Sequence, residues 1–207
     1  MRNADTMAKK HPVPLRIGLF GGSFDPIHHG HLISSWDALE QMRLDRIVFI
    51  PCALSPHKSD PPIAPGEERL KMIRQATRGW SAFSLSECEL ERGGPSYSVD
   101  TAEEMRRRFP TAELFWIIGS DQTRSLPAWK DYPRLRKLVT FLIVPRPRYV
   151  EIAAEHGTAL LPAPHLVDIS STEIRDRAQN GLPIGHLVPR PVAAHIAKRR
   201  LYAKTPV

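Results

Sequence analysis

Short, uninterrupted apolar runs separated by helical patterns constrain the fold of this chain more than any other feature. The clearest run spans Glu113–Ile118, where five apolar residues follow one another. Continuous rather than alternating apolar runs are typical of parallel strands that are covered on both faces. Similar runs lie at 15–20, 46–51 and 140–144, with a shorter one at 166–169. The sequence therefore predicts an α/β protein with a doubly wound, open parallel sheet and helices on both faces.

Helical spacing of apolar residues predicts five helices between and after these strands. They lie at about 32–42, from Gly66 onward, and at 99–109, 170–180 and 191–202. The segment 83–90 alternates more weakly and predicts an edge strand. Five prolines from Pro51 to Pro65 exclude a helix or a central strand there. We expect this stretch to be a long loop, and long loops in compact domains are often functional.

The composition limits the class of protein. The 207 residues suit one domain, which we assign to 15–207, after an N-terminal extension at 1–14 that we expect to be disordered. No apolar run approaches the roughly 20 residues that a membrane-spanning helix needs. Only Cys52 and Cys88 are present, so no disulfide framework is implied and a reducing, cytoplasmic location is favoured.

The net charge of +7 fits either a nucleic acid or an anionic small molecule as ligand. Basic residues are scattered, with modest clusters at 106–108, 134–137 and 198–200. These clusters lie on predicted helices, where like charges usually form a solvated face. The sequence shows no RNA-recognition motif, zinc finger or basic-region zipper. We therefore expect a small anionic ligand, with no nucleic-acid or membrane partner.

A glycine-rich turn follows the first predicted strand and leads into a helix. It reads Gly21-Gly22-Ser23-Phe24, then Asp25-Pro26-Ile27-His28-His29-Gly30-His31. Adjacent glycines permit positive φ angles and the close approach of another molecule. The N–H groups at the start of the helix attract anions, above all phosphates. His28 and His31 lie three residues apart, so they should share one side of that helix start, where a neutral ring donates one hydrogen bond.

A second helix start offers a further phosphate site. Ser170-Ser171-Thr172-Glu173 has the spacing of a capping box, and Arg175 lies one turn into the helix. The chain has neither a P-loop nor the dinucleotide-binding glycine pattern. Because both helix starts follow strands, a polyphosphate could stretch between them at one edge of the sheet.

The residue types at the first turn leave two other interpretations open. Three histidines within four positions, beside Asp25, could bind a metal ion, and a zinc hydrolase would add a ligand such as Asp121 or His165. Alternatively, a histidine at a helix start is merely a surface residue. Residue types alone do not decide between phosphate binding, metal binding and an exposed surface.

The run from Gly21 to His31 resembles the signature of the adenylyl- and cytidylyltransferase superfamily, and in particular that of bacterial nicotinate-nucleotide adenylyltransferases. The segment at 169–175, Ile-Ser-Ser-Thr-Glu-Ile-Arg, is similar to the second ATP motif of that family. Further similarity lies in Ser55-Pro56-His57-Lys58, in Pro95-Ser96-Tyr97-Ser98, and in Gly119-Ser120-Asp121 followed by Leu126 and Trp129. The resemblance spans roughly residues 15–202.

The resemblance implies a Rossmann-like fold with a C-terminal helical portion, and the transfer of AMP from ATP to nicotinate mononucleotide, with Mg²⁺ accompanying ATP. It implies that His28, His31 and Arg175 are catalytic. It implies an ATP site made of Gly21, Gly22, Ser23, Phe24, His28, His31, Asp121, Ser171, Thr172 and Arg175. The implied mononucleotide site is Lys58, Tyr97, Ser98, Asp121 and Trp129, with Trp129 stacking on the pyridine ring. No protein metal site is implied, and a homo-oligomer remains open.

Some residues depart from the family pattern. Ser23 and Ser98 replace threonine and keep the hydroxyl group, Ser55 replaces a proline, and Arg148 stands at a position that is usually glycine. Three rival functions also remain. They are an adenylyltransferase for nicotinamide mononucleotide or phosphopantetheine, a nucleotide-binding regulator without catalysis, and a basic nucleic-acid-binding protein.

Overall fold

One six-stranded sheet forms the centre of the molecule. The structure, a computed structural model, describes residues 14–56, 61–147 and 157–204. The strands are β1 (Arg16–Gly22), β2 (Arg46–Pro51), β3 (Phe83–Leu85), β4 (Glu113–Gly119), β5 (Thr140–Val144) and β6 (Thr158–Leu160). They pair in parallel in the order β3-β2-β1-β4-β5-β6. The order reverses between β1 and β4, which is where open sheets of this kind bind ligands.

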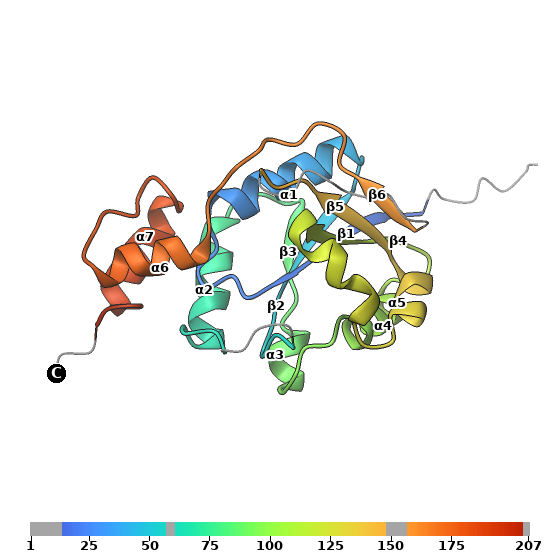
Figure 1. Cartoon of the computed structure of the whole chain (residues 1–207), viewed down its shortest axis with the longest axis horizontal. Helices are drawn as coiled ribbons and strands as arrows, with labels where there is room; N and C mark the ends of the chain where they lie inside the picture. Colours follow the sequence, from blue (N-terminus) through green and yellow to red (C-terminus); the bar gives the residue numbers. More distant parts are fainter. Residues whose placement is uncertain (1–13, 57–60, 148–156, 205–207) are drawn as a thin grey trace, which may run out of the picture.

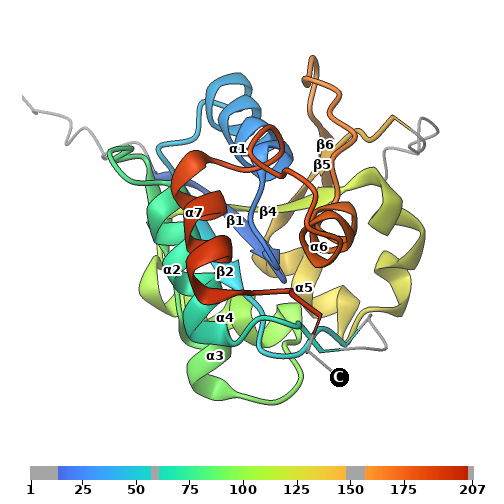
Figure 2. The ribbon, with the colours of Figure 1, turned by 90° about the vertical axis from the view of Figure 1, so that its left-hand side faces the viewer.

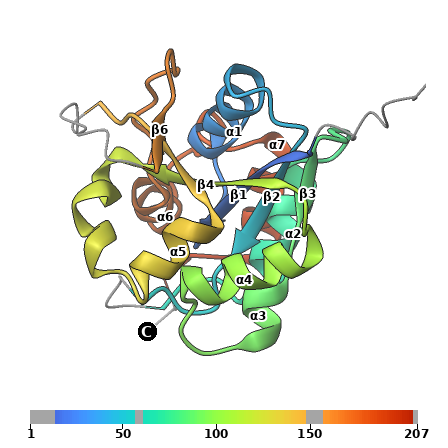
Figure 3. The same cartoon turned by 90° about the vertical axis from the view of Figure 1, so that its right-hand side faces the viewer.

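Helices cover both faces of this sheet. They are α1 (His29–Gln41), α2 (Gly66–Ala76), α3 (Cys88–Arg92), α4 (Ser98–Arg108), α5 (Tyr132–Leu138), α6 (Ser171–Gln179) and α7 (Arg190–Arg199), with a 3₁₀ helix, η1, at Ser120–Ala128. Figure 3 shows α1 on one side of the strands and α4 and α5 on the other. In the described residues, none of the helices is long and apolar enough to cross a membrane.

Strand β4 is buried on both faces of the sheet, which explains its continuous run of apolar residues. Phe115 and Ile117 belong to the core that also contains residues of α1, α2, α6 and α7. Leu114, Trp116 and Ile118 belong to the opposite core, with residues of α4 and α5. A strand that is buried on both faces needs apolar residues at successive positions. The predicted doubly wound α/β fold is therefore confirmed.

The C-terminal helices α6 and α7 lie together at one end of the molecule (Figures 1 and 2). Helix α7 packs on α2, where His195 Nε2 lies 2.6 Å from Glu68 Oε2. Val192 and Ile196 bury the inner side of α7 in the core. The predicted C-terminal helical portion is confirmed. The predicted extension at 1–14 falls almost entirely on residues 1–13, outside the described part of the chain, and stays a prediction.

Two strand predictions were wrong. The predicted edge strand at 83–90 ends at Leu85, and residues 88–92 form α3. Pairing with β2 ends at Leu85 opposite Phe49, with one further bond from the Ser86 N–H to Phe49 O, because the chain then turns into α3. The segment 166–169 is not a strand, because side chains of α1 hold the chain just before it; the sixth strand is Thr158–Leu160.

Candidate active site

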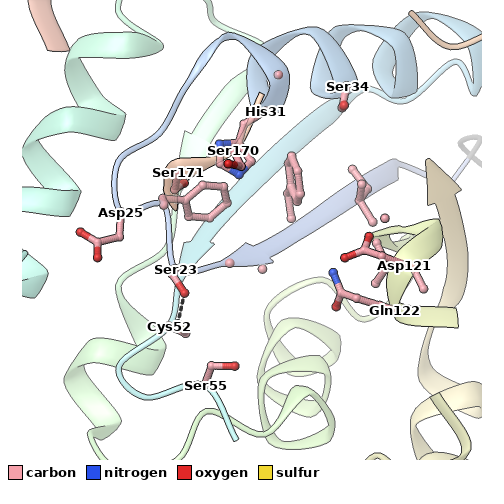
Figure 4. A pocket seen from close by; sticks show the side chains of 18 of the residues that line it. Ser23, Asp25, His31, Ser34, Cys52, Ser55, Asp121, Gln122, Ser170 and Ser171 are labelled. Carbon is pink, nitrogen blue, oxygen red and sulfur yellow. Dashed lines mark hydrogen bonds between the residues drawn. The ribbon is translucent and has the colours of Figure 1, made fainter. Parts of the chain in front are cut away.

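A cavity of about 1330 Å³ lies where β1, β4 and β5 end. It is lined by the turn at 20–25, the starts of α1 and α6, part of the loop after β2, and the segments that follow β4 and β5 (Figure 4). A pocket for one small ligand usually measures about 300–1,000 Å³. This cavity therefore has room for more than one small molecule.

Packing leaves little room for a side chain at the two glycines of the turn. A Cβ atom on Gly21 would come within 3.2 Å of the Trp116 ring, and one on Gly22 within 3.2 Å of the Phe24 ring. The positive φ angle expected in this turn falls on Phe24 instead, at 47°. Phe24 is fully buried, with its ring against Phe20 and Phe49, so the core holds its backbone in this conformation.

His28 and His31 cap the same helix start reciprocally. The His31 N–H donates to Nδ1 of His28 at 3.4 Å, and the His28 N–H donates to Nδ1 of His31 at 3.3 Å. The two rings stack with their centroids 3.7 Å apart. Because each Nδ1 accepts a hydrogen bond, the proton of each neutral ring lies on Nε2. Both histidines line the cavity, as the sequence prediction requires of phosphate ligands.

Burial keeps the ring of His28 neutral. Burial first, and then the positive charge of Arg146, lower the pKa of His28 from 6.5 to about 3. The neutral ring expected from the sequence is confirmed for His28, and burial is its main cause. A neutral ring that is fixed in one tautomer is a donor of defined direction.

The second predicted helix start is attached to the first turn. Ser170 caps α6 by accepting the N–H of Glu173 at 3.1 Å. The Ser171 hydroxyl donates to Pro26 O at 2.9 Å. Arg175 donates to Asp25 O at 2.9 Å and to Thr172 Oγ1 at 3.2 Å. The structure thus brings together the residues of both predicted phosphate sites, although they lie about 140 positions apart.

Asp25 points away from the cavity (Figure 4). Its buried carboxylate accepts the N–H groups of Ile63 and Ala64 at 2.7 and 3.1 Å and the hydroxyl of Tyr202 at 2.8 Å. Burial, followed by the negative charge of Asp25, raises the pKa of Tyr202. Sequence analysis placed Asp25 beside the histidines as a potential metal ligand and missed this structural role.

The other proposed metal ligands are also engaged elsewhere. The His165 ring contacts the carboxylate of Asp37, and Asp121 pairs with Arg146. In the part of the chain that the structure describes, no group of three or more His, Cys, Asp or Glu residues is placed to hold a metal ion. The contacts of these residues therefore favour the phosphate interpretation of the turn.

Asp121 and Arg146 lie at the ends of β4 and β5. Asp121 Oδ1 is 3.1 Å from Arg146 Nε, and the Arg146 N–H donates to Ser120 Oγ at 2.9 Å. Both residues line the cavity. Sequence analysis named Asp121 but missed Arg146. Its position directly after a continuous apolar run, at the ligand-binding edge of the sheet, was the available signal.

The residues predicted for the mononucleotide are dispersed. Ser98 and Trp129 line the cavity, but Trp129 is only 6% exposed and its ring packs against Phe141. Tyr97 is half-buried in the core under α4, with Lys130 Nζ 4.2 Å from its ring centre. Lys58 lies outside the described residues, as does Arg148.

Glu89 is a buried carboxyl group in the cavity lining that sequence analysis missed. The Thr101 hydroxyl donates to Glu89 Oε1 at 2.7 Å. Burial raises the pKa of Glu89. The sequence predicted that Glu89 lies on a strand, whereas it belongs to α3. The wrong element hid its position in the cavity lining.

Comparisons with known proteins identify relatives that match most of the chain. Residues 19–177 match the family model described as cytidylyltransferase-like. A probable nicotinate-nucleotide adenylyltransferase of Methylacidiphilum infernorum is 46% identical over 193 residues, which is 93% of this chain and 95% of the relative. Another, from Thermus thermophilus, is 46% identical over 188 residues, covering 91% of this chain and 100% of the relative.

Solved structures support the fold. The nicotinic acid mononucleotide adenylyltransferase of Plasmodium falciparum, complexed with NaAD, superposes with a TM-score of 0.73 at 21% identity, covering 91% of this chain and 97% of the other. The same enzyme complexed with APC gives 0.71. At this level of identity the likeness concerns the fold alone.

Proposed function

This chain belongs to the nicotinate-nucleotide adenylyltransferases of the cytidylyltransferase-like family, and we propose that it transfers the AMP moiety of ATP to nicotinate mononucleotide, forming deamido-NAD and pyrophosphate. The observation that carries the proposal is the reciprocal cap of His28 and His31. It presents two neutral donors at a helix start beside a second helix start that bears Ser171, Thr172 and Arg175.

In the proposed reaction, a phosphate oxygen of nicotinate mononucleotide attacks the α-phosphorus of ATP in line. The new P–O bond forms as the bond to the bridging oxygen breaks, and that oxygen leaves with pyrophosphate. Such transfers need positioning and charge stabilisation rather than a protein nucleophile. The Nε2–H groups of His28 and His31 donate to the α-phosphate, where negative charge grows. Gly21, Gly22, Ser23 and Phe24 form the wall against which the nucleotide lies.

The β- and γ-phosphates are assigned to the start of α6. The Thr172 hydroxyl and the N–H groups of this turn, that of Ser171 included, supply donors, since the Ser171 hydroxyl already donates to Pro26 O, and the positive end of the helix favours anions. Arg175 already donates to Asp25 O and Thr172 Oγ1, so its guanidinium is fixed in direction before ATP arrives. This fixed direction supports a role in charge stabilisation as the pyrophosphate leaves.

We assign Mg²⁺ to ATP rather than to a protein cage. Of the three acidic residues in the described lining, Asp25 turns its carboxylate away, Glu89 is buried, and Asp121 pairs with Arg146. The ion would therefore be held mainly by the phosphates, with Asp121 as the described carboxylate nearest to a supporting role. When bound, the ion neutralises the charge of the polyphosphate leaving group.

The acceptor is assigned to the remaining part of the cavity. Ser98, the first residue of α4, lines this cavity together with Asp121 and Trp129. Tyr97 and Lys58 complete the proposed set. Because Trp129 is nearly buried, we propose that only an edge of its ring is offered to the pyridine. The whole of 15–207 is proposed as one nucleotidyltransferase domain. Both cysteines are buried thiols, which supports the proposed cytoplasmic location.

The test is pyrophosphate release from ATP and Mg²⁺ by the purified full chain. Parallel reactions contain nicotinate mononucleotide, nicotinamide mononucleotide or phosphopantetheine. We expect release with nicotinate mononucleotide to exceed the others by at least tenfold. Equal or greater release with another acceptor would keep the reaction and overturn the substrate. Nucleotide binding without release would support the regulator instead.

A further inference from the structure

His165 lies in the cavity lining but has no role in the proposed reaction. The ring is largely solvent-exposed, at 76%, yet its orientation is fixed by a buried residue of α1. Asp37 Oδ1 lies 2.7 Å from His165 Nδ1, and Asp37 Oδ2 accepts the His165 backbone N–H at 2.7 Å. Both oxygens of a buried carboxylate are thus directed to one residue at the cavity rim.

The contact with Asp37 determines which nitrogen of the ring carries the proton. A carboxylate only accepts hydrogen bonds, so Nδ1 of His165 is the donor. In the neutral ring, Nε2 then carries the lone pair and accepts. His165 therefore differs from His28 and His31, whose Nε2 atoms are donors.

A neighbouring contact shows that anchoring the chain does not require the ring. One turn further along α1, the side chain of Gln41 binds only the backbone of Ala163. Its oxygen accepts the Ala163 N–H at 2.9 Å, and its amide nitrogen donates to the Ala163 carbonyl at 2.7 Å. Asp37 also accepts a backbone N–H, but in addition it orients an imidazole. The additional bond indicates that the direction of the ring matters.

The surroundings of His165 suit a purine base. Val144, Val167 and Ile169 belong to the same cavity lining, the last two shortly after His165 in the chain, and they provide apolar surface for a flat ring. The phosphates are assigned to the two helix starts and the acceptor to the part of the cavity near Ser98. We therefore assign the base of ATP to the part of the lining that contains His165.

We infer that His165 is a specificity-determining residue whose Nε2 accepts a hydrogen bond from the 6-amino group of adenine, with Asp37 as its positioning residue. The inference rests on the proposed function, because it uses the proposed direction of ATP in the cavity. A 6-oxo purine presents an acceptor at the same place. Two acceptors facing each other leave both without a donor, so the site rejects that base.

The decisive variant is His165→Asn. Its side-chain amide can still donate to Asp37, so the chain stays anchored, but no acceptor remains at the place of Nε2. We expect kcat/KM for ATP to fall about fivefold, the size of one neutral hydrogen bond, with the KM for nicotinate mononucleotide unchanged. The preference for ATP over inosine triphosphate should fall by the same factor. Equilibrium binding of ATP and of inosine triphosphate, measured in the absence of an acceptor, should show the same loss of preference.

Gln41→Ala is the matched control, because it removes an anchor of the same segment without touching the ring. We expect this variant to keep the wild-type preference for ATP over inosine triphosphate. If His165→Asn also kept it, or if both variants lowered it equally, the inference would be overturned while the proposed function stood. A wild-type protein that released no pyrophosphate with any acceptor would overturn the proposed function, and the inference with it.

Discussion

The two helix starts that face the cavity are built in opposite ways. At α1 the two candidate side chains orient each other locally: His28 and His31 cap each other, and the ring of His28 is buried. At α6 the candidate side chains reach across the fold, because Ser171 and Arg175 bind the backbone of Pro26 and Asp25, some 145 and 150 positions away. The pairing of the two histidines therefore follows from four successive residues, whereas the orientation of Ser171 and Arg175 depends on how distant parts of the chain are folded together.

The burial of His28 provides the largest expected effect. In the unfolded chain this ring takes up a proton near pH 6.5, but in the fold only near pH 3. The neutral ring therefore stabilises the fold fully above pH 6.5, and this contribution is lost as the pH falls toward 3. A pKa shift of this size corresponds to at most about 4–5 kcal/mol in the free energy of unfolding.

Urea unfolding at several pH values measures this contribution. The variant His28→Asn keeps an acceptor for the cap but does not titrate. We expect its free energy of unfolding to decline less than that of the wild type between pH 6.5 and pH 4. Parallel decline in the two proteins would show that His28 is accessible to protons, and that the α1 site is not preorganised by burial.

His31→Ala tests whether the local cap serves catalysis. The change removes one proposed donor to the α-phosphate, and losing such a donor typically lowers kcat by roughly 10²–10³-fold. ATP binding should be largely kept, because the other phosphate contacts remain. Initial rates and equilibrium binding of ATP separate the two effects. His29→Ala, at the adjacent position, is the control that should stay close to wild type, and unchanged turnover in His31→Ala would contradict the proposed role.

Arg175→Lys tests the long-range site. Lysine keeps the charge but cannot form the two directed contacts to Asp25 O and Thr172 Oγ1 at once. We expect kcat/KM for ATP to fall about tenfold or more, since a hydrogen bond to a charged group is worth about 1.5–3 kcal/mol. Steady-state kinetics with varied ATP give the measurement. Arg177→Lys on the same helix should have little effect, and equal losses in the two variants would mean that only the helix is disturbed.

The same contrast explains what the sequence could predict. His28 and His31 lie within four residues, so the helical period alone places them together, and the strand β4 follows from its uninterrupted apolar run. The bond between Asp25 and Tyr202 joins residues 177 positions apart, and no local pattern indicates it. The wrong strand at 166–169 has the same origin, because Asp37 determines the path of that segment from α1.

Ser171→Ala has the smallest expected effect and separates the attachment of α6 from its chemistry. The Ser171 hydroxyl donates to Pro26 O, so alanine leaves this carbonyl without that donor and α6 less firmly held to the α1 turn. One such bond contributes about 1 kcal/mol, and we expect a few-fold rise in the KM for ATP with a matching loss of stability. Ser171→Thr keeps a hydroxyl and should restore both. If the KM for ATP rose without any loss of stability, the hydroxyl would act on the phosphates directly. The contact between Ser171 and Pro26 would then matter little for the position of α6.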